Sequence, residues 1–198
     1  MATRSEIPLD QLGIQPFHLW STRWFLLAAG EYPDGAAGQP GHAGRAAAAG
    51  HAGFNFMTVS WGGLGFLWAK PFAMVVVRPG RYTRGFIDHA STFTLSVLPE
   101  ADRGVLNYAG SHSGREGDKA KAAGLTPERS RLVTAPSFVE AELVLECRKS
   151  YFHDLDPARF LDRSIEAHYP DKDYHRVYFG EVLAASGTEE WTTVGGVE

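Results

Sequence analysis

The sequence has a single cysteine, no long apolar run and no surplus of positive charge. Because Cys147 is alone, an intramolecular disulfide and a metal site built from several thiolates are both excluded. No apolar run approaches the ~20 residues that span a membrane, and the first residues lack the apolar core of a signal peptide. The net charge of −4 gives no general attraction to nucleic acid or membranes. We therefore expect a cytoplasmic protein that binds neither.

Motifs for hydrolysis and for common nucleotide sites are also missing. The sequence has no Gly-x-Ser-x-Gly, no His-Glu-x-x-His, no P-loop spacing and no Gly-x-Gly-x-x-Gly after a strand. His42 and His51 have no carboxylate or thiol neighbours, so no metal site is predicted there. The remaining internal histidines are scattered and are interpreted as surface or satisfied side chains, with His153 and His112 as the first exceptions: His89, His112, His153, His168 and His175. Without acid–base machinery, a reaction at this protein calls for a cofactor.

The length of 198 residues and the 44% hydrophobic content fit one domain with one core. Apolar periodicity predicts strands over residues 23–32, 55–61, 72–77, 92–98, 139–147 and 174–184. Helices are expected over 83–90, capped by Thr83, from Pro99 through Ala109, and over 115–123, closed by Gly124. Strands outnumber helices, and the helices lie in the connections. This pattern favours a mainly β fold with a closed or sandwich-like antiparallel sheet.

Three segments are predicted to lie outside the core. Residues 1–22 look like an arm on the surface, and the tail from Ser186 looks loose. In residues 35–53, 14 of 19 positions are Gly or Ala, which predicts a flexible insertion that is dispensable for folding. Cys147, on the apolar side of an alternating strand, is expected to be a small core residue.

The stretch from Asn55 to Gly65 is the most informative part of the chain. Its first half alternates, with Phe56, Thr58 and Ser60 on one side of a strand and the following residues on the other: Asn55, Met57, Val59 and Trp61. Glycines follow at positions 62, 63 and 65, where a turn and close approach of another group are possible. The stretch fits a ligand-binding strand, and it equally fits an ordinary sandwich strand with a glycine turn.

Two basic clusters stand out in this acidic chain. One follows the expected strand at 72–77 and contains Arg78, Arg81 and Arg84 with Thr83. The other places two hydroxyls and two cations at a predicted helix N-terminus, a favourable position for a phosphate: Ser111, Ser113, Arg115 and Lys119. Aromatic side chains near these segments offer walls for a flat ring: Trp61, Trp68, Tyr82, Phe86 and Tyr151. The alternatives are a solvated basic patch and core aromatics.

Several motifs occur in one order along residues 20–185. They are Asn55–Gly65, Lys70-Pro71, Val77–Thr83, Phe93–Ser96, Gly110–Lys119, Leu145–Lys149, Asp154–Pro157 and Asp173–Arg176. Together they resemble the flavin reductase-like family, in particular its flavoredoxin-like branch. The stretch 35–53 is longer than the resemblance leads us to expect, which affects how the cleft is covered.

The resemblance implies an FMN-binding split β-barrel, with Greek-key antiparallel strands, that forms a homodimer with FMN at or near the subunit interface. It implies that the isoalloxazine and ribityl chain of FMN contact Asn55, Met57, Thr58, Ser60 and Trp61. It implies that the phosphate end contacts Arg78, Arg81, Thr83, Ser111, Ser113, Arg115 and Lys119. We add His153 to these candidate cofactor residues and expect no catalytic acid or base.

The expected activity is transfer of hydride from NADH or NADPH through FMN to free flavin, a metal complex or another protein. An FMN-binding electron carrier that is reduced by a protein partner uses the same site, and the sequence has no nicotinamide-nucleotide motif to separate the two. Binding of pyridoxal phosphate or haem on a related barrel is a third alternative.

Overall fold

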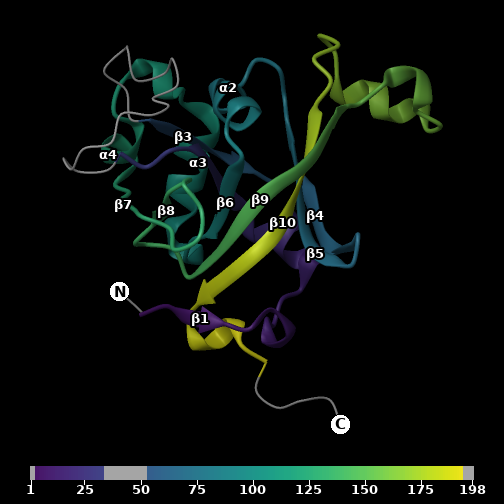
Figure 1. The fold of residues 1–198 in the computed structure, drawn as a ribbon. Helices are drawn as coiled ribbons and strands as arrows, with labels where there is room; N and C mark the ends of the chain where they lie inside the picture. Colours follow the sequence, from purple (N-terminus) through teal and green to yellow (C-terminus); the bar gives the residue numbers. More distant parts are fainter. Residues whose placement is uncertain (1–2, 34–52, 194–198) are drawn as a thin grey trace.

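The computed structural model describes residues 3–33 and 53–193 and shows a strongly curved antiparallel sheet, with short helices in the connections between its strands (Figure 1). The sheet consists of β1 (Ser5–Ile7), β2 (Phe25–Gly30), β3 (Phe54–Val59), β4 (Gly62–Leu67), β5 (Lys70–Val77), β6 (Thr92–Val97), β9 (Leu143–Asp154) and β10 (Arg176–Gly187). Its order is β3-β2-β6-β9-β10-β5-β4, with β1 on β10. The predicted insertion at 35–53, except Gly53, lies outside the described residues, as does the end of the chain.

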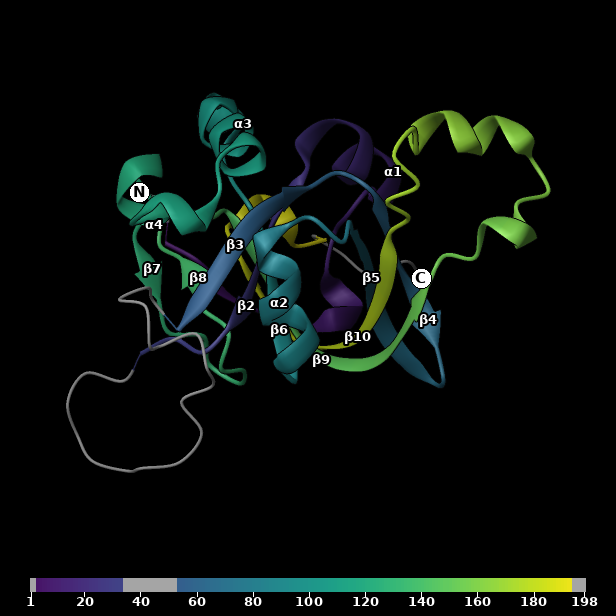
Figure 2. The same cartoon turned by 90° about the horizontal axis from the view of Figure 1, so that it is seen from above.

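Short elements fill the connections. The helices are α1 (Pro16–His18), α2 (Tyr82–His89), α3 (Arg103–Ser111) and α4 (Lys119–Ala123), and a small second sheet pairs β7 (Pro127–Glu128) with β8 (Ser137–Phe138). A π-helical turn covers Leu19–Arg23, and 3-10 turns cover Leu9–Gln11, Glu100–Asp102, Gly114–Glu116, Pro157–Arg159, Arg163–His168 and Glu189–Trp191. Viewed from above, α3 and α4 lie beside β3, and α2 lies near the middle of the sheet (Figure 2). Among the described residues, no helix is long and apolar enough to cross a membrane.

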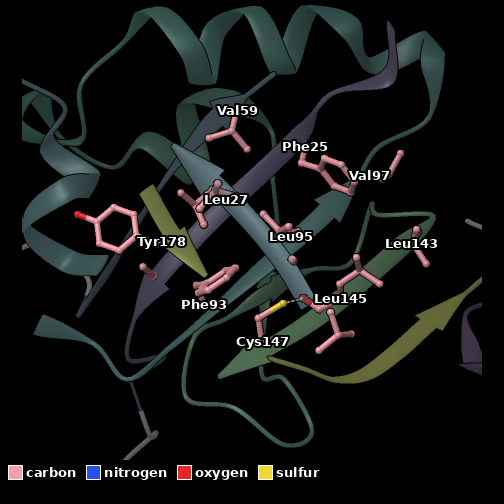
Figure 3. Packing of buried hydrophobic residues seen from close by; sticks show 14 of the residues in the cluster. Phe25, Leu27, Val59, Phe93, Leu95, Val97, Leu143, Leu145, Cys147 and Tyr178 are labelled. Carbon is pink, nitrogen blue, oxygen red and sulfur yellow. Dashed lines mark hydrogen bonds between the residues drawn. The ribbon is translucent and has the colours of Figure 1, made fainter. Parts of the chain in front are cut away.

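The curved sheet encloses the main core. Leu95 of β6 lies in register with Leu27 of β2 and Leu145 of β9, and all three side chains are buried together (Figure 3). Burial of one such side chain contributes about 1.5–3 kcal/mol. Cys147 is fully buried in the same cluster, as predicted. The predicted alternation at Leu143, Leu145 and Cys147, and at Met57 and Val59, therefore marks the inner face of the sheet. The bounds of the strand predicted over 139–147 were wrong, because β9 begins at Leu143 and continues to Asp154.

A second apolar cluster lies on the outer face of β2, β3 and β9. It packs Leu26, Phe56 and Val144 against residues of α3, α4 and β8, including Leu106, Ala120 and Phe138. The same layer covers Thr94 and Ser96, which alternate with apolar residues along the strand predicted over 92–98. Both are fully buried, and the Thr94 hydroxyl donates 2.5 Å to the carbonyl of Pro136. Alternation alone does not show that a second layer covers the sheet.

Both ends of the described chain belong to the fold more closely than predicted. β1 pairs with β10, and Ile7, Leu19 and Trp20 lie in the main core, so residues 1–22 are not only a surface arm. At the other end, β10 continues to Gly187 and Trp191 is 7% exposed, so the described residues 186–193 are not loose, contrary to the prediction. The two ends meet in a bridge between Leu12 and Thr192.

Some predictions of local structure were wrong at positions where contacts with distant residues determine burial or helix ends. Residues 72–77 form part of β5, as predicted, but only every second residue of this apolar run is buried and the others are half-buried. Thr83 does not cap α2 but accepts a hydrogen bond from Asn55. The helix expected over 115–123 is divided, because Gly117 has a φ of 136° and Asp118 caps a separate α4, which Gly124 closes as predicted.

The glycines after β3 do not form the predicted turn. They lie in β4, and the turn to β5 comes at Trp68 and Ala69, whose φ angles are 54° and 59°. A Cβ at Gly62 would lie 2.4 Å from the ring of Trp20 and 2.3 Å from the carbonyl oxygen of Met74. Gly62 therefore allows β4 to pack directly on the core.

β9 and β10 also extend beyond the sheet, and residues 155–175 between them form an arm that projects from the body (Figure 1, upper right). The arm carries Leu161, which is fully exposed. This arm was not predicted, because its short turns have no apolar periodicity.

Gly62→Ala should destabilise the fold, because either β4 or Trp20 must move to admit the methyl group. We expect a loss of roughly 1–3 kcal/mol in the free energy of unfolding, as for other overpacked sites. Gly63→Ala is the matched control, since a Cβ at position 63 would lie 3.7 Å from its nearest neighbour, the Cε of the flexible Met74 side chain. Urea unfolding of both variants checks this, and equal losses in the two would contradict the packing argument.

Candidate functional site

A cavity of about 660 Å³ lies against β3, α2 and α4. It is lined by Phe54, Asn55, Phe56, Tyr82, Phe86, Gly114, Gly117, Asp118, Lys119, Ala120, Lys121, Leu125, Thr126 and Pro127. Its walls combine aromatic rings with a small number of polar groups, as ligand cavities commonly do. Two of the predicted site residues, Asn55 and Lys119, line it directly.

Asn55 joins three segments at this cavity. Its Nδ2 donates 2.9 Å to Oγ1 of Thr83, and both side chains are buried. A Cβ at position 114 would lie 2.2 Å from Oδ1 of Asn55, so only glycine allows this approach. The predicted grouping of Asn55, Thr83 and the 110–119 segment is therefore present in space.

Lys119 is 7% exposed, and its Nζ donates to the carbonyls of Phe56 at 2.9 Å and Ala109 at 2.7 Å. Ala109 lies in the last turn of α3, where carbonyls have no partner within the helix. Burial, with a smaller contribution from the charge of nearby Arg81, lowers the pKa of Lys119 to about 8, against the opposing effect of Glu116. An ammonium has three N–H donors, so one remains for the cavity.

Two further cations lie near Lys119. Arg81 precedes α2 and is half-buried, and burial lowers its pKa. The guanidinium of Arg115 lies 4.5 Å above the ring of Tyr82. Within residues 3–33 and 53–193, no carboxylate forms an ion pair with Arg81, Arg115 or Lys119. In a chain of net charge −4, such a group fits an anionic ligand.

The predicted hydroxyls nearby are bonded within the protein. Thr58 donates 2.5 Å to the carbonyl of Leu106, and Ser111 donates 2.8 Å to the carbonyl of Asn107. Ser113 accepts from the backbone N–H of Arg115. Ser60 is half-buried just after β3. Of these bonds, the one from Thr58 joins β3 to α3, while those of Ser111 and Ser113 stabilise the end of α3 and the 113–116 turn.

Arg78 belongs to a different part of the molecule than the sequence grouping implied. It donates 2.5 Å to Asp173 and 2.8 Å to the carbonyl of His168, and its guanidinium lies 5.1 Å from the ring of Tyr169. It therefore holds the base of the arm. Because Arg78 forms an ion pair with Asp173, it does not belong to the group of cations without ion-pair partners near the cavity.

Trp61 joins the cavity strand to the arm. It follows β3, is 44% exposed, and its ring centroid lies 5.3 Å from the rings of His168 and His175. β3 and β4 are the two ends of the strand order, so Ser60 and Trp61 connect the two edges where the sheet is open. From Asn55 to Ser60 the strand spans roughly 16 Å, at about 3.3 Å per residue.

His175 is a further candidate for the site, although its sequence position alone led us to interpret it as a surface or satisfied histidine. It is 8% exposed, and its Nδ1 lies 2.8 Å from the hydroxyl of the buried Tyr169. Burial and then the charge of Arg78 lower the pKa of His175 to about 4, against the opposing effect of Asp173. The Asp173–Arg176 motif was the one signal for it in the sequence.

The remaining predicted residues lie elsewhere. Met57 is 7% exposed and packs in the main core. His153 is exposed on β9 opposite Val177, with its Nδ1 2.5 Å from the carbonyl of Asp154, and it does not line the cavity.

Comparisons with known proteins show the family and the fold. The sequence model described as "Flavin reductase like domain" matches residues 42–192. No curated protein is significantly similar in sequence. An FMN-binding domain of a flavin reductase-like enzyme from Shewanella baltica OS155 superposes with a TM-score of 0.63, at 16% identity over 100% of this chain and 83% of the other.

Two other solved structures have the same fold. For the flavoredoxin of Desulfovibrio vulgaris (Miyazaki F), the TM-score is 0.59 at 21% identity over 90% of this chain and 73% of the other. For nitrilotriacetate monooxygenase component B from Bacillus cereus it is 0.59 at 16% identity over 92% and 75%. The predicted split-barrel fold is thereby confirmed.

Lys119→Met should destabilise the protein even without a ligand, because the carbonyls of Phe56 and Ala109 lose their donor. An unsatisfied buried acceptor costs about 1–3 kcal/mol. Lys121→Met, which removes an exposed lysine two residues away on the same helix, is the control and should change stability by less than about 0.5 kcal/mol. Denaturant unfolding measures both; equal effects would show that the two carbonyl bonds contribute nothing.

Proposed function

Because the chain belongs to the flavin reductase-like family, we propose that it is an FMN-dependent oxidoreductase that takes hydride from NADH or NADPH and passes electrons to a further acceptor. The observation that carries the proposal is the group of cations without ion-pair partners around the cavity beside β3. Among the described residues, Arg81, Arg115 and Lys119 form no ion pair with a carboxylate, and Glu116 acts on Lys119 only as a nearby charge, yet the chain as a whole is acidic. The phosphate of FMN, with a charge between −1.5 and −2, fits this place.

The rest of the site follows the strand. With the phosphate near Lys119, Asn55 and Thr83 offer polar contacts to the ribityl chain, and Ser60 and Trp61 lie farther along β3 toward the ring. Thr58, Ser111 and Ser113 contribute by holding the surrounding backbone, as their internal hydrogen bonds support. When bound, FMN supplies the hydride and electron chemistry, and the protein supplies binding and orientation. Holding two rings in contact is enough to accelerate such a transfer.

A flavin-based electron carrier is the second candidate, favoured by the likeness to flavoredoxin. The two functions share one cofactor site and differ in the electron donor. A carrier exchanges electrons with a protein partner and does not react with NADH or NADPH.

Anaerobic mixing of the FMN-loaded protein with NADH, and separately with NADPH, distinguishes the two functions. We expect rapid loss of the flavin absorbance with at least one nucleotide, because the family's reductases position both rings. Dithionite provides the control for complete reduction. Bleaching by dithionite but by neither nucleotide would contradict the reductase and support the carrier.

Arg81→Gln should weaken binding of FMN about ten- to a hundred-fold, since a hydrogen bond to a charged group contributes about 1.5–3 kcal/mol. Riboflavin, which lacks the phosphate, should bind wild type and variant with similar affinity. Arg84→Gln, three residues farther along in α2 and paired with Asp88 and Asp154, is the matched control. Fluorescence titration measures all affinities. Equal losses of affinity for FMN and riboflavin would show that Arg81 does not bind the phosphate.

We also propose that the protein is a homodimer. Phe66, Trp68 and Tyr151 are 72%, 60% and 45% exposed, and the ring of Trp68 lies 6.2 Å from that of Tyr151. An aromatic group of this kind on the outside of a sheet is typical of an interaction surface. A second copy related by two-fold symmetry is the commonest way to cover it.

Light scattering at micromolar concentration should give about twice the chain mass of 21.6 kDa. Trp68→Glu should shift the protein toward the monomer, because a buried charge in the interface costs several kcal/mol. Leu161→Glu, at a fully exposed position on the arm, is the control. A wild-type mass near one chain would contradict the homodimer.

A further inference from the structure

We propose that Tyr169 is a positioning residue of the proposed flavin site. Its hydroxyl fixes which nitrogen of His175 carries the proton, and this makes Nε2–H of His175 a hydrogen-bond donor beside Trp61. The inference rests on the proposed function, because the ring that receives this hydrogen bond lies against Trp61. It assigns a task to the base of the arm.

The hydrogen bond between Tyr169 and His175 determines the tautomer. Both residues are buried, at 4% and 8% exposure, and the hydroxyl lies 2.8 Å from Nδ1. A buried O–H requires an acceptor, and among the described residues Nδ1 is the only one bonded to this hydroxyl. The hydroxyl therefore donates to Nδ1, and in a neutral imidazole the proton then resides on Nε2.

The imidazole is neutral at physiological pH. Burial and the neighbouring charge of Arg78 lower the pKa of His175 to about 4. A neutral donor of this kind binds a carbonyl oxygen or a ring nitrogen without adding positive charge to the site.

The base of the arm holds the pair in place. Arg78 lies 5.1 Å from the ring of Tyr169 and is itself bonded to Asp173. The backbone carbonyl of His175 accepts 2.9 Å from the N–H of Leu155 on the opposite side of the arm. Locking a side chain through its neighbours is how a site gains geometric precision.

The donor lies next to the open edge of the sheet. The ring of His175 is 5.3 Å from that of Trp61, at an angle of 46°. Within the described part of the chain, no hydrogen bond joins Nε2 of His175 to a protein acceptor. The partner that fits is a flat ring bearing a carbonyl oxygen or a basic nitrogen. The carbonyl edge of a flavin and the carboxamide of a nicotinamide share this chemistry.

Four variants test the assignment: Tyr169→Phe, His175→Gln, the double variant, and Tyr174→Phe as matched control. Tyr174 also packs against Tyr169, with ring centroids 4.9 Å apart, but its hydroxyl donates to Glu166. In the ligand-free protein, ¹⁵N NMR of His175 should show the Nε2–H tautomer, and Tyr169→Phe should shift the population toward Nδ1–H. The control should not. This measurement needs no flavin, so its failure is separate from failure of the proposed function.

In the FMN-loaded protein, Tyr169→Phe and His175→Gln should both change either the FMN affinity or the KM or rate with NADH or NADPH. Each change should be about two- to ten-fold, as for loss of one neutral hydrogen bond. The double variant should equal the His175→Gln variant, because Tyr169 acts through His175. A change in flavin spectrum or FMN affinity without nucleotide assigns the acceptor to the flavin. A change confined to the KM or rate with NADH or NADPH assigns it to the nicotinamide. An unchanged tautomer in Tyr169→Phe, or additive effects in the double variant, would overturn the proposal.

Discussion

The two hydrogen bonds from Lys119 to backbone carbonyls join the three elements that form one side of the candidate site. They join β3 at Phe56 to the last turn of α3 at Ala109, and they begin from the first residue of α4. A charged side chain is seldom buried without such partners. Because the ammonium holds both elements, the cavity wall is shaped around a positive charge before any ligand arrives. The same charge, with Arg81 beside it, is what a phosphate would recognise.

The sheet contributes a second constraint, which is its opening between β3 and β4. Ser60 and Trp61 connect these edges, while Gly62 lets β4 pack on Trp20 immediately afterwards. One strand therefore carries polar groups at the cation-rich cavity and leads to an exposed indole near the arm. An elongated ligand with an anionic end and a flat aromatic end matches this order. His175 and Tyr169, at the base of the arm, add a hydrogen-bond donor to the proposed site. This donor is the Nε2–H of a neutral imidazole, which burial keeps uncharged.

The sequence predicted what periodicity controls. The alternation of β3 and the buried position of Cys147 were confirmed, and the grouping of Asn55, Thr83 and Lys119 was found in space, although the role of these three residues in binding stays a prediction. It did not predict contacts set by distant partners. Arg78 and Arg81 are three residues apart, yet Asp173 draws the first to the arm while the second stays near Lys119. Thr94 has a polar side chain on an alternating strand, but a second layer buries it. The pairing of Tyr169 with His175 left no periodic signal at all.

The central claim is that Lys119 and Arg81 bind the phosphate of FMN and that Trp61 lies near its isoalloxazine ring. A crystal structure of the protein with FMN tests this claim most directly. The account predicts a phosphate oxygen within about 3 Å of Nζ of Lys119, with both carbonyl bonds of that lysine retained. It predicts the isoalloxazine toward Ser60 and Trp61. A phosphate bound at the base of the arm, or a ring seated among Tyr82 and Phe86 with the phosphate in solvent, would contradict it.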